Sequence, residues 1–372
     1  MSDVVVIGAG LSGLSIGYEL ALRGATVRII ERGDAGKAAS WAGAGMLAPF
    51  TEEISDPAML ELCKQSLARY PQFVARLRED SGIDPHLQTE GIFSVAFDES
   101  QQRNLEARAH HLRVQGVEHR LLDRRETLQA EPALGSHACA SLLVRTEGQV
   151  DNRRLGRALL AACERRGVTV SLGCGEVALE ADARRVLGVR TVTGFRSAGT
   201  VVNAAGAWAA RIEGVPVSCI PEVYPVKGQM LALSIPKNFV RRPIWAPHVY
   251  MVPRIDGRLL IGATVERGGF DVRVTAGAVH KLLSGALAAA PALAGFTLSE
   301  AWAGLRGASS HGKPVISKTS LDGYFLATGH FRNGILLAPM TGTMTADLIE
   351  GRANALAAPF ALVLMTPEAV AR

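Results

Sequence analysis

The N-terminal stretch up to Glu31 most constrains what this chain can fold into, because it places a glycine turn between a strand and a helix. The β-branched run Val4–Ile7 predicts a buried strand of a parallel sheet, and the glycine turn of residues 8–13, Gly-Ala-Gly-Leu-Ser-Gly, follows it directly. A helical pattern ends at Gly24, and a second strand is expected over 26–30. Strand, turn, helix, strand and acid together are typical of a dinucleotide-binding unit.

Each glycine of the turn has a physical role in that unit. Gly8 permits the tight turn, Gly10 lets the backbone approach a pyrophosphate, and Gly13 lets the helix lie against the strand. The helix N-terminus offers free N–H groups and a positive dipole to the phosphates. Glu31 is placed to accept hydrogen bonds from ribose hydroxyls and would repel the 2′-phosphate of NADP. The residues of this unit leave NAD and FAD as alternatives.

Composition excludes several other classes of protein. The chain has 372 residues, of which 48% are hydrophobic, so it can form one large domain or two closely joined domains and is not disordered. The formal net charge is +5, but basic and acidic residues are interspersed, as over 76–80. This mixture is typical of a solvated surface, and we expect no nucleic-acid partner.

The cysteines and the N-terminus indicate where the protein works. The 5 cysteines are an odd number without a Cys-x-x-Cys pair, which argues against both a disulfide framework and a zinc site. No signal-peptide pattern opens the chain, and Glu19 and Arg23 interrupt the apolar run before it could span a bilayer. We therefore expect a soluble cytoplasmic protein with no membrane span and no metal.

Further along the chain, the patterning predicts two interleaved domains. An α/β rhythm returns near Gly148, and longer alternating strands occupy much of 217–302. A strand ending in Ala204 leads to Gly206, at the carboxyl edge where open α/β sheets bind ligands. We predict a nucleotide-binding domain over 1–85, 148–216 and 302–372, and a smaller second domain over 86–147 and 217–301.

Three local expectations concern helices. Asp56 and Pro57 predict the start of a helix in which Pro71 should cause a kink or a break. Residues 99–132 are predicted to be helical and exposed. Asn152 is a candidate N-cap for a later helix.

Longer motifs are more specific than the glycine turn. They are WAGAGMLAP over 41–49, WAGLR over 302–306, and GHFRNGILLAP over 329–339. With the N-terminal unit, they resemble the D-amino-acid oxidase superfamily of FAD-dependent amine oxidases, and within it the glycine oxidase subfamily, essentially from end to end. The resemblance implies an α/β protein in which a Rossmann-like FAD-binding domain is interleaved with a smaller α+β substrate domain dominated by an antiparallel sheet.

The resemblance also implies FAD held without a covalent bond. Some relatives tether their flavin through a C-terminal cysteine, whereas no cysteine follows Cys219 here. The implied cofactor-binding residues are Gly8, Gly10, Leu11, Ser12, Gly13, Glu31 and Arg32 around the ADP part, Ala39, Ser40, Ala44, Gly45 and Met46 along the pyrophosphate and ring, Val177 at the adenine, Gly206, and His330, Phe331, Arg332, Asn333, Gly334, Ile335 and Leu336 beside the isoalloxazine.

Four residues are implied at the substrate. Arg306 aligns with the carboxylate-binding arginine of the superfamily, and Arg332 with a second position beside it. A planar guanidinium grips a carboxylate bidentately and stays charged. Tyr250 and His248 are two residues apart on an expected strand and would then share a face.

The implied reaction is oxidative deamination of glycine and other small amines, such as sarcosine or D-amino acids. Hydride transfer to flavin needs no acid or base on the protein, so we assign no catalytic side chain. O₂ would accept the electrons and give H₂O₂, and the imine product would supply thiamin thiazole synthesis. A dehydrogenase of the same fold that reduces a quinone or a partner subunit is the alternative, as is a flavin-binding subunit without turnover. The preferred amine and the oligomeric state, including a homo-oligomer, stay open.

Overall fold

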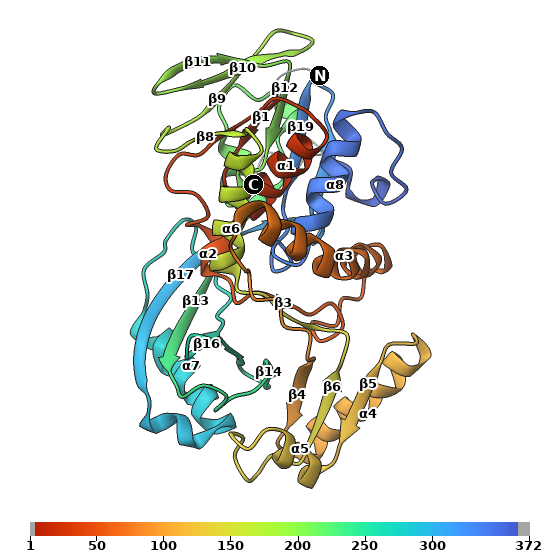
Figure 1. Cartoon of the computed structure of the whole chain (residues 1–372), viewed down its shortest axis with the longest axis vertical. Coiled ribbons are helices and arrows are strands. Elements are labelled where there is room, and N and C mark those ends of the chain that lie inside the picture. The colour runs from red at the N-terminus through yellow and green to blue at the C-terminus, as the bar shows by residue number, and fades with distance from the viewer. Residues whose placement is uncertain (1–3, 364–372) are drawn as a thin grey trace.

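We analysed a computed structural model, which describes residues 4–363. A six-stranded sheet forms one end of the molecule (Figure 1), with strand order β18-β19-β12-β1-β2-β8. The strands from β19 to β8 pair in parallel, and β18 pairs antiparallel to β19. Their bounds are β1 Val4–Ile7, β2 Val27–Ile30, β8 Thr169–Ser171, β12 Thr200–Asn203, β18 Val315–Lys318 and β19 Tyr324–Thr328.

Both faces of this sheet are covered, which explains the β-branched run in β1. Val4 and Val6 pack into a core formed with the helices, whereas Val5 and Ile7 pack into a second core on the opposite face, beneath a small antiparallel sheet. The helices of the first core are α1 Leu11–Leu22, α3 Pro57–Ser81, α6 Asn152–Arg165 and α8 Ala338–Ile349, and the small sheet comprises β9 Ala178–Ala181, β10 Val186–Thr191 and β11 Gly194–Ser197.

An eight-stranded sheet forms the other end, with strand order β17-β13-β16-β15-β14-β4-β6-β5. Neighbouring strands are antiparallel except for the parallel pair of β14 and β4. Its elements are β4 Ile92–Ala96, β5 His119–Leu122, β6 Ala140–Val144, β13 Val223–Ser234, β14 Ile244–Trp245, β15 Tyr250–Pro253, β16 Arg258–Gly262 and β17 Thr297–Ser309, with the helices α4 Glu99–Val114, α5 Arg124–Ala130 and α7 Ala276–Ala289.

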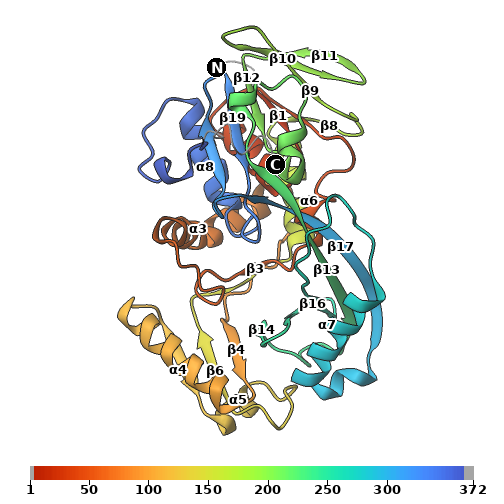
Figure 2. The same ribbon diagram turned by 180° about the vertical axis from the view of Figure 1, so that it is seen from behind.

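Two long strands connect the ends of the molecule. β13 and β17 belong to the eight-stranded sheet and extend from it towards the six-stranded sheet (Figure 1). Figure 2 shows the same arrangement from behind. The proposed domain boundary at 302 falls inside β17. Shorter connecting elements are α2 Ala39–Ala42, the pair β3 Met46–Leu47 and β7 Gly148–Gln149, and the 3₁₀ turns η1 Gly206–Arg211, η2 Val217–Cys219, η3 Pro291–Gly295 and η4 Ala358–Phe360.

The predicted α/β architecture is confirmed, whereas three local details differ from expectation. Of the kink or break expected at Pro71, the break does not occur, since the apolar side of α3 is packed into the first core along its whole length. β5 interrupts the predicted helical stretch over 99–132, because it pairs with β6. Asp151, not Asn152, caps α6, accepting hydrogen bonds from the backbone of the first turn. None of the helices over residues 4–363 combines the length and apolar character needed to cross a membrane.

The contact between α1 and the turn before it gives a first prediction. A Cβ on Gly13 would lie 1.9 Å from the Gly8 carbonyl oxygen, so alanine must push the helix away from the sheet. We expect Gly13→Ala to lower the free energy of unfolding by more than about 2 kcal/mol, as measured by urea denaturation. Gly277→Ala in α7 is the matched control, because nothing lies within 4 Å of that position. Equal effects of the two substitutions would contradict the steric argument.

Candidate functional site

A cavity of about 590 Å³ opens at the carboxyl ends of β1, β2 and β12. Its walls come from segments far apart in the sequence, including the glycine turn, the residues after β2 and the loop between β19 and α8. The predicted cofactor-binding residues that line it are Gly8, Gly10, Leu11, Ser12, Glu31, Arg32, Ala39, Ser40, Val177, Gly206, His330, Phe331, Arg332, Gly334 and Ile335, and Arg306 also lines it. The cavity is not lined by six other predicted residues, which are Gly13, Ala44, Gly45, Met46, Asn333 and Leu336.

The N-terminus of α1 faces this cavity. Gly8 has a φ of +104°, and a Cβ there would lie 2.7 Å from the Ala204 carbonyl oxygen, so the turn requires glycine. Gly10 is the N-cap and supplies no side-chain hydrogen bond, and the first turn carries no acid. The Ser40 hydroxyl accepts a hydrogen bond from Leu11 N at 2.9 Å. The remaining N–H groups of the first turn suit the phosphates of a bound dinucleotide.

Glu31 is fixed at the end of β2. Its carboxylate accepts hydrogen bonds from Ala9 N at 2.8 Å and from Gly33 N at 3.1 Å. A carboxylate has about four acceptor positions, so it retains capacity for ribose hydroxyls. Next to it, the guanidinium of Arg32 lies over the Trp208 ring, 3.8 Å from the centroid.

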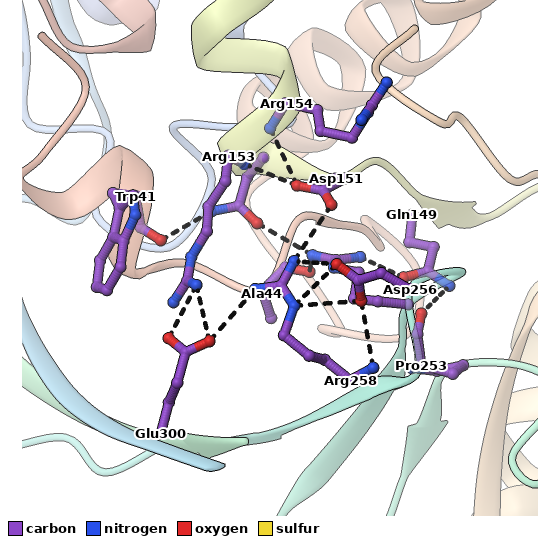
Figure 3. Close-up of polar contacts among 12 residues, drawn as sticks. Trp41, Ala44, Gln149, Asp151, Arg153, Arg154, Pro253, Asp256, Arg258 and Glu300 are labelled. Atoms are coloured by element: carbon purple, nitrogen blue, oxygen red, sulfur yellow. Dashed lines mark hydrogen bonds and ion pairs between the residues drawn. The ribbon is translucent and has the colours of Figure 1, made fainter. Parts of the chain in front are cut away.

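A buried arginine binds the backbone of the segment that contains Ala44, Gly45 and Met46. Arg254 donates to the Ala44 carbonyl at 2.7 Å, to Asn152 Oδ1 at 3.0 Å and to the Gln149 side-chain oxygen. Burial lowers the pKa of Arg254 to about 10, so its guanidinium stays charged at neutral pH. Figure 3 shows the polar contacts around Ala44 and Gln149, with the ion pair of Arg153 and Glu300 (2.9 Å) beside Trp41.

The loop after β19 is held by α3, a support that our sequence reasoning missed. The Ser66 hydroxyl donates to the Leu336 carbonyl at 2.6 Å, and the Tyr70 hydroxyl donates to the Ile335 carbonyl. The i, i+4 spacing of Ser66 and Tyr70 on the buried side of α3 was the available signal.

Within this loop, the Asn333 backbone N–H donates to the His330 carbonyl at 2.9 Å. The His330 ring pairs with the Thr341 hydroxyl at 2.9 Å. Burial lowers the pKa of His330 to about 4, so the ring is neutral at neutral pH.

Arg306 lines the cavity, and Tyr250 lies beside Arg306. Nη1 of Arg306 donates weakly to the Thr264 carbonyl at 3.3 Å. Burial lowers the pKa of Arg306, and the neighbouring Tyr250 opposes that shift. Each of these side chains lies directly against the backbone of a glycine. A Cβ on Gly228 would be 2.3 Å from Arg306, and a Cβ on Gly262 would be 2.4 Å from the Tyr250 ring.

His248 is placed differently from Tyr250. β15 begins at Tyr250, so the strand alternation that would give the two residues a common face does not reach His248. The His248 side chain is exposed, and its Cβ lies close to α7 at Gly285. The structure therefore does not bring His248 to the two arginines.

Glu52 is a buried-type carboxyl group that our sequence reasoning did not predict. Burial raises the pKa of Glu52, and the charges of Arg332 and Arg306 oppose that shift. It is carried by a turn over 50–53 whose backbone is bound by the fully buried Glu147, which accepts from Phe50 N at 2.6 Å. No motif marks Glu52, because its position depends on contacts between distant segments.

Cysteine and metal chemistry add nothing to this site. All five cysteines are free thiols. Over residues 4–363, no group of three or more His, Cys, Asp or Glu side chains is arranged to hold a metal ion.

Comparison with known proteins identifies the family. Residues 3–348 match the family model described as DAO: FAD dependent oxidoreductase. The chain therefore belongs to this family, and the prediction of FAD as cofactor is confirmed. The helix N-terminus at Gly10, which has no side-chain cap hydrogen bond, the carboxylate of Glu31 and the cavity fit that cofactor. Attachment without a covalent bond stays a prediction.

Three individual proteins show which members of the family the chain is similar to. The chain is 36% identical over 351 residues to the glycine oxidase of Pseudomonas aeruginosa, covering 94% of this chain and 95% of that protein. It is 34% identical to the bifunctional protein ThiO/ThiG of Trichormus variabilis, covering 96% of this chain but only 54%, about half, of that longer protein. The crystal structure of glycine oxidase from Geobacillus kaustophilus superposes with a TM-score of 0.93 at 35% identity, covering 98% of this chain and 99% of that one.

The turn that carries Glu52 gives a prediction on pH dependence. Burial raises the pKa of Glu147 from 4.5 to about 7, although hydrogen bonds from the turn favour its ionised form. Between these values the folded protein keeps the proton that the unfolded chain has released, so stability falls as pH rises from about 4.5 to 7. Over this pH range, we expect the free energy of unfolding to fall by about 1 to 3 kcal/mol less in Glu147→Gln than in the wild type. Urea denaturation at a series of pH values measures this difference.

The control for this experiment is Glu118→Gln, since the Glu118 side chain is 69% exposed. It should follow the wild-type pH profile. A Glu147→Gln profile as steep as that of the wild type would show that Glu147 titrates normally.

Proposed function

We propose that this protein catalyses the oxidative deamination of glycine and other small amines, such as sarcosine or D-amino acids. The observation that carries the proposal is Arg306, which reaches the end of the FAD cavity with Tyr250 beside it. A partly buried guanidinium suits the carboxylate of a small amino acid. The glycine oxidases among the relatives support this substrate class.

The chain's own residues would bind and orient the substrate. Arg306 and Arg332 hold the carboxylate, and this anchorage fixes the α-carbon relative to the cofactor. FAD supplies the chemistry of the step by accepting a hydride from that carbon. Arg254, Ser66 and Tyr70 hold the backbone segments around the cavity so that substrate and cofactor meet in one geometry.

We further propose O₂ as the electron acceptor, with H₂O₂ as the second product, and thiamin thiazole synthesis as the use of the imine. The bifunctional ThiO/ThiG relatives support the second point. A dehydrogenase of this family would instead reduce a quinone or a partner subunit. Peroxide formation that depends on oxygen separates the two. Five free thiols support a reducing, cytoplasmic location.

The substrate class is tested with the purified yellow protein. Peroxide should form with one or more of glycine, sarcosine, D-alanine and D-proline, each supplied in air. Flavin that is bleached by an amine without oxygen consumption would favour the dehydrogenase. Flavin that no amine bleaches would contradict the proposed function.

The carboxylate clamp is tested with Arg306→Ala. Removing the guanidinium should raise KM for glycine by at least about 30-fold, because truncating one partner of a desolvated charge pair costs about 2 to 5 kcal/mol. FAD content, measured by absorbance after acid release, should stay normal. The control is Arg267→Ala, which removes an exposed guanidinium that lies over the Tyr224 ring. A near-normal KM in the Arg306 variant would refute the clamp.

A further inference from the structure

A loop that belongs to neither half of the predicted cofactor motifs packs against the wall of the FAD cavity. This loop runs over residues 263–275, from β16 to α7, and we call it the strap. Its Phe270 ring lies 5.4 Å from the Trp208 ring, centroid to centroid, and the Arg211 guanidinium lies 4.0 Å from the Phe270 centroid. Trp208 and Arg211 line the cavity, whereas Phe270 does not. Phe270 therefore contacts the wall of the cavity and not its interior.

Trp208 connects Phe270 with a second arginine of the cavity wall. The Arg32 guanidinium lies over the Trp208 ring, and Arg32 directly follows Glu31, the acid expected at the ribose. Arg32 and Arg211 are exposed side chains, so an aromatic face that attracts the guanidinium restricts the positions that each can adopt. The two rings thus hold two positive groups at the wall of a cavity that receives an anionic cofactor.

Ion pairs fix the strap on both sides of Phe270. Nζ of the buried Lys227 in β13 is 3.8 Å from a Glu266 carboxylate oxygen and 3.5 Å from one of Asp271. The backbones of Lys227 and Glu266 exchange hydrogen bonds of 2.9 and 3.0 Å. Between these anchors, Gly269 has a φ of +60°, which lets the chain turn. The course of the strap beside Phe270 is therefore set by β13 and not by the cavity wall.

The strap turns one apolar side chain towards the wall and leaves its neighbours in solvent. Phe270 is half-buried, whereas Val272 and Val274 are 53% and 39% exposed. A general need to cover apolar surface would not single out one residue of the three. The contact of Phe270 with Trp208 and Arg211 is thus a specific feature of this loop.

We propose that Phe270 is a positioning residue for FAD, which acts through Trp208 and Arg211 and slows release of the cofactor. Side chains that are already ordered lose less conformational entropy when a ligand binds, so a wall held by the strap binds FAD more tightly than a mobile one. The inference goes beyond the proposed function, because it holds whichever amine the enzyme oxidises.

The test measures release of FAD from the loaded protein. The protein is diluted in series, free flavin is separated by ultrafiltration, and the dissociation constant follows from the bound fraction. We expect Phe270→Ala to weaken FAD binding by about three- to tenfold, the size expected for loss of an aromatic pair. Phe270→Tyr keeps the ring and should retain the wild-type constant. A wild-type constant in Phe270→Ala would overturn the proposal.

The matched control is Val272→Ala, which shortens an exposed apolar side chain of the same strap and should leave FAD binding unchanged. A double substitution tests the route of the effect. Adding Phe270→Ala to Trp208→Ala should weaken FAD binding less than Phe270→Ala does alone, because the effects of residues in contact are not additive. Fully additive effects would show that Phe270 does not act through Trp208, and would refute the proposed role.

A purely structural role of Phe270 gives a different result. Phe270→Ala would then lower the Tm of the protein measured in excess FAD and leave the FAD dissociation constant at its wild-type value, which would contradict the proposal. Failure of the proposed function is separate, since FAD release is measured without substrate. If no amine bleaches the flavin, amine oxidation is refuted, while a weaker FAD constant in Phe270→Ala alone would still support the role of the strap.

Discussion

The buried guanidinium of Arg254 is the interaction on which the arrangement of the site depends. It directly follows β15 and donates hydrogen bonds to Ala44, which is next to the cavity-lining Gly43, to Gln149 in β7 and to Asn152 in α6. Its partners are neutral oxygens, so the charge is stabilised by hydrogen bonds from several segments at once. The eight-stranded sheet, which carries Tyr250, is thereby tied to the backbone that borders the FAD cavity.

The cofactor site could largely be predicted from the sequence, because its chemistry lies in short contiguous segments. The turn at Gly8, the acid at Glu31 and the loop from His330 each carry their spacing within a few residues. Local geometry determines which groups of these segments face the cavity. For example, a helix must follow the glycine turn, and its N-terminus then faces the cavity. Most of the residues expected there accordingly line one cavity.

The substrate end could be predicted only in part. Arg306 stands in a recognisable motif, whereas the turn that carries Glu52 is bound by Glu147, which is 95 positions beyond Glu52 along the chain. His248 shows the opposite error, since the alternation of a strand was extended to a residue that precedes the strand. Both cases reflect tertiary contacts that have no periodic signal. β5 escaped prediction for the same reason, because pairing with β6 overrides its helical neighbours.

The glycines behind Arg306 and Tyr250 have a consequence for how this family can diversify. Gly228 and Gly262 leave no space in which a larger side chain could fit without displacing the arginine or the tyrosine. The wall formed by Arg306 and Tyr250 is therefore closed to gradual remodelling from behind. The turn over 50–53 is held by its backbone, so its side chains can change while its course is kept. If Arg306 binds a carboxylate as proposed, substitutions that enlarge these two glycines would disturb that binding before they altered any other part of the substrate site.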